Sequence, residues 1–202
     1  MTLWRGQHPL ILASQSRGRK MLLENAGIAF EAVPAEIDER GVQERSGLAG
    51  PGEIAALLAR EKALFVSSRK HGHYVIGADQ TLALGDRLFS KPSSRVEAAS
   101  QLRALAAQTH ELHSAVAVVR DGSIMFETIS VARMRMRQLG GEDIRRYLDE
   151  AGETVTTTVG AYQLEGLGVH LFERIEGDHF TILGLPLMPL LGYLRDQSLL
   201  AI

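Results

Sequence analysis

Residues 110–137, HELHSAVAVVRDGSIMFETISVARMRMR, restrict the fold of this chain more than any other segment. Two arms rich in β-branched residues flank Asp121-Gly122, a dipeptide that favours the two-residue turn of a β-hairpin. A second hairpin is indicated at Gly85-Asp86, within TLALGDRLF. Because a hairpin pairs its strands antiparallel, a sheet that contains two of them is not purely parallel.

Around these hairpins, short apolar runs alternate with segments of helical spacing. The helical segments are at about residues 19–26, 52–69, 94–107, 141–150 and 186–196, and the apolar runs are PLILAS, IAFEAVP, YVIGAD and VHLFER. Residues 34–52, rich in charge, Gly and Pro, predict a long loop. With 202 residues and 45% hydrophobic content, the chain is long enough for one substantial core. We expect a single α/β domain over residues 1–202, with two lobes and a mixed sheet flanked by helices.

The composition argues against several classes of partner. The formal net charge is −2, so the broad positive field that holds nucleic acid is missing, and an anionic partner must be held locally. The chain has no cysteine, which excludes disulfides, thiolate metal sites and cysteine nucleophiles. No stretch approaches the roughly 20 apolar residues of a membrane span, and the N-terminal apolar run is too short and broken for a signal peptide. We expect a cytoplasmic protein with no nucleic-acid or membrane partner.

The segment LASQSRGRK, residues 12–20, is the first candidate site. A strand there delivers hydroxyl and guanidinium groups, Ser14 and Arg19 among them, to the start of a helix. Free backbone N–H groups and the positive end of the helix dipole favour anions at such a place, so the segment could hold a phosphate chain. It lacks a Walker pattern, and Ser16 could simply cap the helix while the basic side chains stay solvated. Both interpretations stay open from these residues alone.

Carboxylates form the second candidate group. Glu36, Asp38 and Glu39 cluster in the expected long loop, where a cation site and an ordinary exposed acidic loop look the same. Asp79 ends the apolar run YVIGAD, where burial costs free energy unless the carboxylate has a partner or a task. We therefore expect Asp79 to face a crevice and to have a function. Lys91, in the segment SKP after a hairpin, is by itself typical of a surface lysine.

Other charged and metal-binding side chains fit structural roles better. Three arginines alternate at positions 133, 135 and 137, so they share one face of a strand, and a solvated face explains them better than nucleic-acid binding. His71 and His73, like His110 and His113, have spacing that suits metal ligands. Without a helical context or a third ligand, we expect them to be ordinary loop and strand histidines.

Five segments in order resemble the Maf-like family of nucleoside triphosphate pyrophosphatases. LASQSRGRKMLL, EIDE, LAREKA, GADQ and SKP are similar to the family patterns LASxSPRRxxLL, idE, LAxxKA, GaD and KP. The segments cover nearly the whole chain, and five matches in register are far more specific than any one of them. The resemblance implies a mixed α/β fold of the Maf/ITPase-like kind, with an elongated sheet and two lobes around a central cleft, and it implies a homodimer.

The resemblance also implies hydrolysis of a nucleoside triphosphate to the monophosphate and pyrophosphate by a metal-activated water. Ser14, Arg19, Lys62 and Lys91 would hold the triphosphate, whose several negative charges require several cations. Lys62, on the helix at 52–69, could instead pair with a neighbour such as Glu61, and the family pattern favours phosphate.

The same resemblance assigns the metal site. Glu39 and Asp79 would hold a divalent metal, Mg²⁺ or Mn²⁺, between the acids and the phosphates. Asp79 would in addition act as the general base that accepts a proton from the attacking water.

Within the family, GADQ, LEGLGVHLFERIEG and GLPL are similar to segments of the branch that hydrolyses 7-methyl-GTP. The branches that act on pyrimidine nucleotides usually have Thr in place of Gln80 and Gln in place of Glu165. Guanine presents N1–H and N2–H₂ side by side, two donors that one carboxylate can accept, whereas uracil and thymine offer one donor between two acceptors. Gly18 departs from both branches, which usually have Arg or Trp there. We expect Gly18, Gln80 and Glu165 to set specificity, with Glu165 reading a guanine-type base.

A rival prediction comes from another class of protein. A non-catalytic nucleotide-binding regulator of septum formation or cell division, a role associated with this family, would bind nucleotide without turnover. Such a regulator would have no need of the acid pair Glu39 and Asp79, so the pair favours an enzyme. We therefore expect a pyrophosphatase that removes a modified nucleotide such as 7-methyl-GTP.

Overall fold

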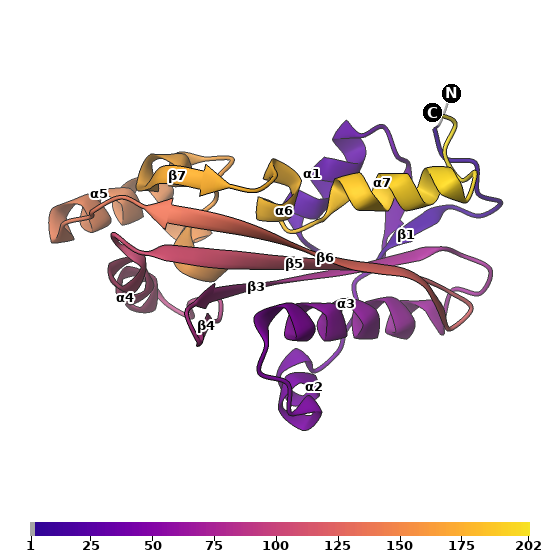
Figure 1. Cartoon of the computed structure of the whole chain (residues 1–202), viewed down its shortest axis with the longest axis horizontal. Coiled ribbons are helices and arrows are strands. Elements are labelled where there is room, and N and C mark those ends of the chain that lie inside the picture. The colour runs from indigo at the N-terminus through magenta and orange to yellow at the C-terminus, as the bar shows by residue number, and fades with distance from the viewer. Residues whose placement is uncertain (1–2) are drawn as a thin grey trace. The chain divides into compact units, whose positions relative to one another are not determined.

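The computed structural model describes residues 3–202, and its strands form a mixed β-sheet (Figure 1). Within these residues seven strands pair in the order β2-β1-β3-β5-β6-β7, with β4 added on β3. The strands are β1 (Leu10–Leu12), β2 (Phe30–Ala32), β3 (Val75–Leu84), β4 (Arg87–Phe89), β5 (Thr109–Arg120), β6 (Ser123–Met136) and β7 (Phe172–Glu176). β1 is parallel to β2 and β3, whereas β4 and β7 are antiparallel to β3 and β6. The predicted mixed sheet is confirmed.

The chain divides into two compact units. Unit 1 comprises the residues up to Gln80, Ser114–Ser130 and Leu183–Ile202, and unit 2 comprises Thr81–His113 and Val131–Ile182. The helices of unit 1 are α1 (Arg17–Asn25), α2 (Glu39–Ser46), α3 (Pro51–Ser67) and α7 (Leu187–Asp196). Those of unit 2 are α4 (Arg95–Leu105), α5 (Gly141–Ala151), α6 (His179–Ile182) and the 3₁₀ helices η1 (Gly152–Thr156), η2 (Val159–Ala161) and η3 (Leu167–Leu171). Across residues 3–202 no helix is long and apolar enough to cross a membrane.

Both predicted hairpins are confirmed. β5 and β6 turn at Asp121 and Gly122, whose φ angles of 47° and 77° are those that a two-residue hairpin turn requires. The Gly122 N–H donates to Ser67 Oγ at 3.2 Å, which fastens this turn to the end of α3. The other hairpin joins β3 to β4 through Gly85 at φ 57°.

In unit 1, α3 lies along one face of the strands, and α1 and α7 lie along the opposite face (Figure 1). Small side chains bring α3 close to the sheet, since Ala55 and Ala59 of α3 pack against Ala115 and Ala117 of β5. Their burial is complete or nearly so. A helix and a strand that meet through alanines lie closer together than ones that meet through large side chains.

Gly77 of β3 lies directly against the backbone of α3. A Cβ atom at Gly77 would lie 2.1 Å from the Ala59 carbonyl oxygen and 2.7 Å from the Ala63 backbone nitrogen, both in α3. Backbone atoms cannot rotate away, so only glycine fits here. Gly77 and Asp79 are two residues apart in β3 and therefore point to the same face of the sheet. The distance between α3 and Asp79 thus depends on Gly77.

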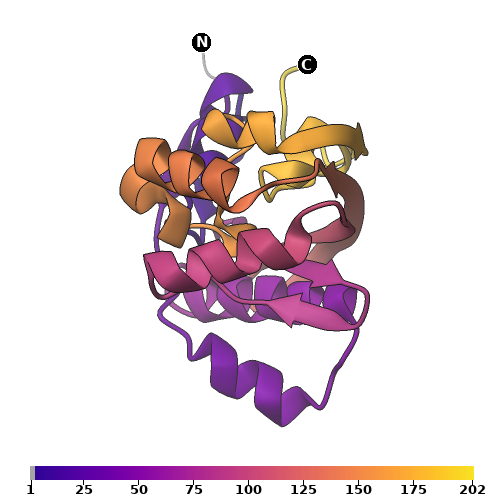
Figure 2. The same ribbon diagram turned by 90° about the vertical axis from the view of Figure 1, so that its left-hand side faces the viewer.

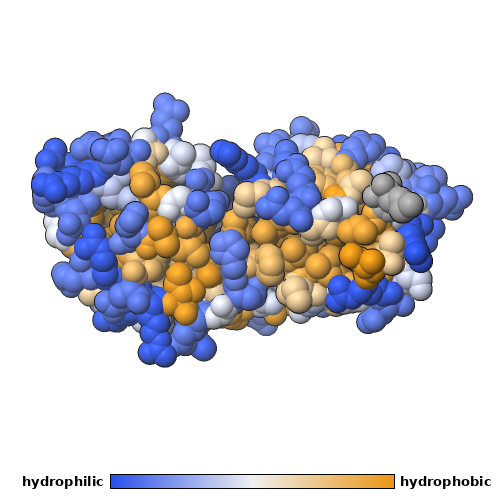
Figure 3. Space-filling model, turned by 90° about the horizontal axis from the view of Figure 1, so that it is seen from above, coloured by the Kyte–Doolittle hydropathy of each residue, from blue (hydrophilic) through white to orange (hydrophobic). Residues whose placement is uncertain are grey.

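Unit 2 has its own hydrophobic core. Leu102 and Leu105 of α4, Ile144 and Leu148 of α5, and Met134 of β6 belong to one buried cluster. Figure 2 shows α4 and α5 side by side. The outer surface over α5 is hydrophilic, as the blue left-hand end of Figure 3 shows, because this helix carries its charged side chains outward and its apolar stripe inward.

In unit 1 the two ends of the described chain pair with each other. Trp4 and Leu200 form an isolated antiparallel bridge, and the Ala201 N–H donates to the Leu3 carbonyl at 2.9 Å. The Trp4 indole N–H donates to the His8 carbonyl at 2.7 Å. The only tryptophan of the chain is therefore occupied in joining the N-terminal and C-terminal segments.

The prediction of a long loop over residues 34–52 is wrong, because Glu39–Ser46 form α2. Asp38 caps this helix by accepting the Gly41 N–H at 3.0 Å, and Gly47, at φ 67°, ends it. No residue of α2 is buried. The helix therefore lacks the apolar periodicity from which helices are predicted.

Two further boundaries differ from the prediction. Asp79 does not end a strand, because β3 continues through it to Leu84, so that the apolar run and the first arm of the hairpin are one strand. Only the end of VHLFER is extended, since β7 begins at Phe172 and the residues before it form η3. The short helix α6 has only four residues, too few for a periodic signal.

Candidate active site

Lys62, Asp79 and Glu39 form a compact charged cluster in unit 1. The Lys62 Nζ atom of α3 lies 2.6 Å from Asp79 Oδ1 of β3 and 2.7 Å from Glu39 Oε1, at the start of α2. Lys62 and Asp79 are each 8% exposed, whereas the Glu39 side chain is half exposed. The alternative pairing of Lys62 with Glu61 is therefore not the one found. One ammonium group serves two carboxylates from two other elements.

Burial sets the protonation behaviour of this cluster. It raises the pKa of the Asp79 carboxyl above its ordinary value, although Lys62 and then Arg19 act in the opposite direction. Burial also lowers the pKa of the Arg19 guanidinium, against the effects of Asp79 and Glu39. A carboxylate with a raised pKa binds a proton more strongly, which suits it to accept one during a reaction.

The loop between β1 and α1 places the second group of predicted residues. Arg19 is buried, and its Nε and Nη1 atoms donate to the Gly184 carbonyl at 2.8 Å and to Ser14 Oγ at 3.2 Å. Ser16 is the N-cap of α1, and its side chain accepts from the Arg19 backbone N–H at 3.5 Å. The capping role of Ser16 is thus confirmed. In the same loop, the direction of the Arg19 guanidinium is fixed by its two acceptors, the Gly184 carbonyl and the Ser14 hydroxyl.

Gly18 and Gln80 lie in the same unit. A Cβ atom at Gly18 would be 3.2 Å from the Leu183 carbonyl oxygen, so a larger residue there would press on the backbone before α7. The Gln80 amide donates to Ser114 Oγ of β5 at 2.9 Å. Gln80 follows Asp79 in β3, so the two side chains point to opposite faces of the strand.

Lys91 and Glu165 belong to unit 2. Lys91 is exposed, in the segment between β4 and α4, and Glu165 is exposed in the loop before η3. These two are the predicted site residues in unit 2. The others lie in unit 1, and they are Ser14, Gly18, Arg19, Glu39, Lys62, Asp79 and Gln80.

The donor set suits a hard divalent cation. Two carboxylates, Asp79 and Glu39, face the same position, which Lys62 Nζ shares, and Mg²⁺ needs only one or two carboxylates when phosphate oxygens and water complete its shell. Within residues 3–202 no group of three or more His, Cys, Asp or Glu side chains gathers as a metal site. A metal held by these two acids would therefore depend on the substrate for its other ligands.

The histidines have structural partners instead. His110 is fully buried in β5, with its Nε2 atom 2.7 Å from the Tyr162 hydroxyl, and His113 Nε2 lies 3.0 Å from Glu111. The ring of His73 stacks on that of His8 at 4.7 Å. The arginines at positions 133, 135 and 137 are exposed or half-buried and paired with acids, as expected for a solvated face.

The sequence did not indicate two glycines that shape this site. Gly77 controls how near α3 comes to β3, and Gly184, at φ 92°, supplies the carbonyl that holds Arg19. A Cβ atom at Gly184 would lie 3.5 Å from the Arg19 guanidinium and 3.8 Å from the Gln80 amide carbon. For Gly184, the sequence offered one signal, namely that this glycine stands just before the LPL segment that leads into a helix.

These features define an α/β protein whose mixed sheet carries a buried carboxylate, paired with an ammonium group, next to a cationic loop at a helix start. The family model described as Maf-like protein matches residues 9–197, and the chain belongs to this family. The matched range runs through both units.

Three curated relatives extend the comparison. A protein named nucleoside triphosphate pyrophosphatase from Rhodopseudomonas palustris (strain HaA2) is 65% identical over 201 residues, covering 100% of both chains. A protein of the same name from Bradyrhizobium diazoefficiens is 65% identical over 202 residues, again covering 100% of both. A 7-methyl-GTP pyrophosphatase from Rhizobium etli is 55% identical over 190 residues, covering 93% of this chain and 95% of the relative.

Proposed function

We propose that this chain is a nucleoside triphosphate pyrophosphatase, which hydrolyses its substrate to the nucleoside monophosphate and pyrophosphate. The observation that carries the proposal is the buried Asp79 carboxylate, 2.6 Å from the Lys62 ammonium. Burying a carboxylate is costly, and an acid with a raised pKa among fixed cations is typical of a catalytic site. The names of the relatives that are 65% identical over the full chain support the same activity.

In this reaction Asp79 accepts a proton from the attacking water. The water oxygen forms a bond to the α-phosphorus, and the bond from that phosphorus to the bridging oxygen of the β-phosphate breaks. The electron pair of the broken bond leaves with pyrophosphate, whose added charge is stabilised by nearby cations. Burial raises the pKa of the Asp79 carboxyl, which makes the carboxylate a stronger acceptor for this proton.

The cations of unit 1 hold and orient the triphosphate. Arg19 is directed by the Ser14 hydroxyl and the Gly184 carbonyl, so little conformational freedom is lost when it binds a phosphate oxygen. Each charge-assisted hydrogen bond of this kind contributes about 1.5–3 kcal/mol. Lys62 supplies further positive charge in unit 1, and we propose Lys91, in unit 2, as another phosphate contact.

Asp79 and Glu39 would hold a divalent cation, Mg²⁺ or Mn²⁺. When bound, such a cation lowers the pKa of water and neutralises phosphate charge. Both carboxylates direct an oxygen at the Lys62 ammonium, and this arrangement supports their binding one cation together. Lys62 is then available to bind phosphate.

We further propose that the base is a guanine-type base and that 7-methyl-GTP is a substrate. Glu165 is an exposed carboxylate in a glycine-rich loop, able to accept two donors from the edge of guanine. The 7-methyl-GTP pyrophosphatase of Rhizobium etli supports this choice. Glu165→Gln should shift kcat/KM away from 7-methyl-GTP across a panel with GTP, dTTP and UTP. An unchanged ranking would remove Glu165 from the base site.

The activity is tested by pyrophosphate release with Mg²⁺ present and after chelation. Asp79→Asn should lower kcat/KM by about 10²–10⁴-fold with the fold intact by circular dichroism, because the amide cannot accept the proton. Asp86→Asn, the same change at an exposed hairpin turn, is the matched control. A wild type that binds nucleotide but releases no pyrophosphate would instead support a non-catalytic regulator of septum formation.

The homodimer and the cytoplasmic location stay predictions. Light scattering of the purified chain would show a mass of twice 22.1 kDa if the dimer forms. A mass of one chain across the concentration range would contradict the dimer.

A further inference from the structure

The segment that carries Lys91 is fixed at both ends by α4. The Ser90 carbonyl accepts from Gln101 Nε2 at 2.8 Å, and the backbone N–H and hydroxyl of Ser93 both donate to Glu97 Oε2 at 2.8 Å. Gln101 and Glu97 are one turn apart on α4. Lys91 therefore projects from a backbone whose neighbours on either side are tied to one helix.

The loop that carries Glu165 is fixed to the same helix. The Gly160 N–H, at the start of GAYQLEGLG, donates to Gln101 Oε1 at 3.1 Å. Gly160 has φ 77°, and a Cβ atom there would lie 2.7 Å from both Leu82 and Tyr162 side-chain atoms. A side chain at position 160 would collide with Leu82 and Tyr162, so the loop keeps this conformation, in which its N–H reaches Gln101, because residue 160 is glycine.

The side-chain amide of Gln101 therefore forms hydrogen bonds to two different segments, one through its nitrogen and one through its oxygen. Its side chain is buried, with the residue 5% exposed. The amide nitrogen holds the segment of Lys91, and the amide oxygen holds the loop of Glu165. Both segments and Gln101 lie in unit 2.

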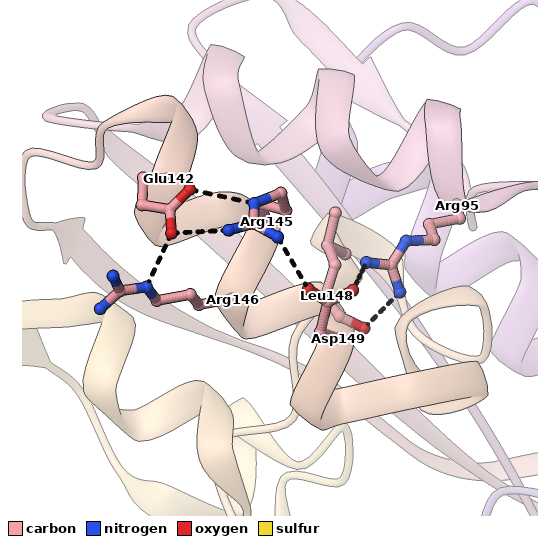
Figure 4. Close-up of polar contacts among 6 residues, drawn as sticks. All are labelled: Arg95, Glu142, Arg145, Arg146, Leu148 and Asp149. Atoms are coloured by element: carbon pink, nitrogen blue, oxygen red, sulfur yellow. Dashed lines mark hydrogen bonds and ion pairs between the residues drawn. The ribbon is translucent and has the colours of Figure 1, made fainter.

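Two neighbouring elements make this arrangement rigid. Arg95, at the start of α4, donates to the Leu148 carbonyl at 2.7 Å and pairs with Asp149 at the end of α5 (Figure 4). Tyr147 of α5 donates its hydroxyl to the Ala161 carbonyl at 3.1 Å, next to Gly160. The glycine loop is consequently held by α4 and α5, which are themselves linked.

We propose that Gln101 is a positioning residue that fixes the separation between Lys91 and Glu165, and hence between a phosphate contact and the base contact of the nucleotide. The proposal rests on the proposed function. In this proposal α4 holds both segments, so the distance between Lys91 and Glu165 matches the distance from the base to the phosphate chain of the substrate. Gln101 itself touches neither substrate nor reacting atoms.

Gln101→Met tests this role, because methionine keeps the length of the side chain and removes both hydrogen bonds. We expect KM for the preferred triphosphate to rise roughly tenfold or more and the ranking of bases to flatten. Hydrogen exchange should increase in peptides that contain Ser90 and in peptides that contain Gly160. Met134→Ala, which truncates a core side chain of β6, controls for general loss of stability in unit 2.

Gln101→Glu provides a readout that a merely structural role would not give. The ionised carboxyl still accepts from Gly160 but cannot donate to the Ser90 carbonyl, so KM should rise at high pH. Burial and the neighbouring Glu97 carboxylate of α4 both raise the pKa of a carboxyl at position 101, and the protonated form regains a donor, so KM should return toward the wild-type value as the pH falls. Wild type measured across the same pH range is the reference.

The positioning role is wrong if folded Gln101→Met keeps the wild-type KM and base ranking, or if Met134→Ala causes the same kinetic change. Unchanged hydrogen exchange at Ser90 and Gly160 in Gln101→Met also overturns it, whatever the activity. A wild type without pyrophosphate release refutes the proposed function itself, which the exchange measurement distinguishes from failure of the inference.

Discussion

Replacing Gly77 by alanine tests whether the contact between α3 and β3 sets the geometry of the charged cluster. The added Cβ atom would lie 2.1 Å from the Ala59 carbonyl oxygen, whereas ordinary contact begins at 3.4 Å. Since the obstructing atoms belong to the backbone of α3, no side-chain rotation relieves the overlap. The helix and the strand must separate by about 1.3 Å.

The structure gives the size of the effect. Overpacking typically costs about 1–3 kcal/mol, and movement of a helix backbone places Gly77→Ala at the upper end of that range. For a chain of this length a loss of about 3 kcal/mol lowers Tm by roughly 6–12 °C. If Lys62 moves with α3, its 2.6 Å contact with Asp79 lengthens beyond hydrogen-bond range. Losing one charge-assisted interaction predicts a fall in kcat/KM of about 10–100-fold.

Thermal melts and pyrophosphate release well below Tm measure the two effects separately. Gly192→Ala is the matched control, because nothing lies within 4 Å of a Cβ atom at this glycine in α7. The control should gain about 0.5–1 kcal/mol from the better helix propensity of alanine. If Gly77→Ala keeps the Tm and kcat/KM of the wild type, the argument that Gly77 sets the distance between Lys62 and Asp79 is refuted.

Two further predictions concern buried charge. Lys62→Met leaves Asp79 and Glu39 without their shared cation, so folding should lose roughly 3–5 kcal/mol at neutral pH. Mg²⁺ should then raise the Tm of this variant more than that of the wild type, and equal shifts would count against a cation position between the acids. Burial lowers the pKa of His110 to about 4 from 6.5, so the unfolded chain binds a proton that the folded chain excludes. Its contribution to stability is complete above about pH 6.5 and is lost as the pH falls toward 4, a cost of about 2 kcal/mol between pH 7 and pH 5. Urea unfolding of His110→Phe should show a smaller loss over this interval than the wild type, and an equal loss would contradict the burial of a neutral imidazole.

Short-range signals predicted much of the fold. Asp121-Gly122 identified the long hairpin because its turn needs positive φ at both positions, a property that these two residues supply locally. The helix α3 was predictable from its apolar spacing, whereas α2 was not, since it buries none of its side chains. A helix that buries an apolar stripe leaves a periodic pattern in the sequence, and a helix such as α2, which buries no side chain, does not.

In the candidate site, too, some features were predictable from the sequence and others depend on the fold. The family resemblance assigned Lys62 to phosphate and Asp79 to a metal, but the sharing of one ammonium group by Asp79 and Glu39 depends on how three elements meet. Gln101 reads in the sequence as an ordinary polar residue of a helix. Its hydrogen bond to Gly160 spans 59 positions, so no local pattern could indicate it.

The anchoring of Arg19 by Gly184 makes unit 1 depend on segments that are far apart in the chain. Unit 1 joins three stretches of chain, and the last of them begins at Leu183. The hydrogen bond from Arg19 Nε to the Gly184 carbonyl, at 2.8 Å, spans 165 positions. The direction of the Arg19 guanidinium is therefore set only when the segment that begins at Leu183 has packed on the rest of unit 1, so this part of the candidate site forms through a long-range contact and not within a local element.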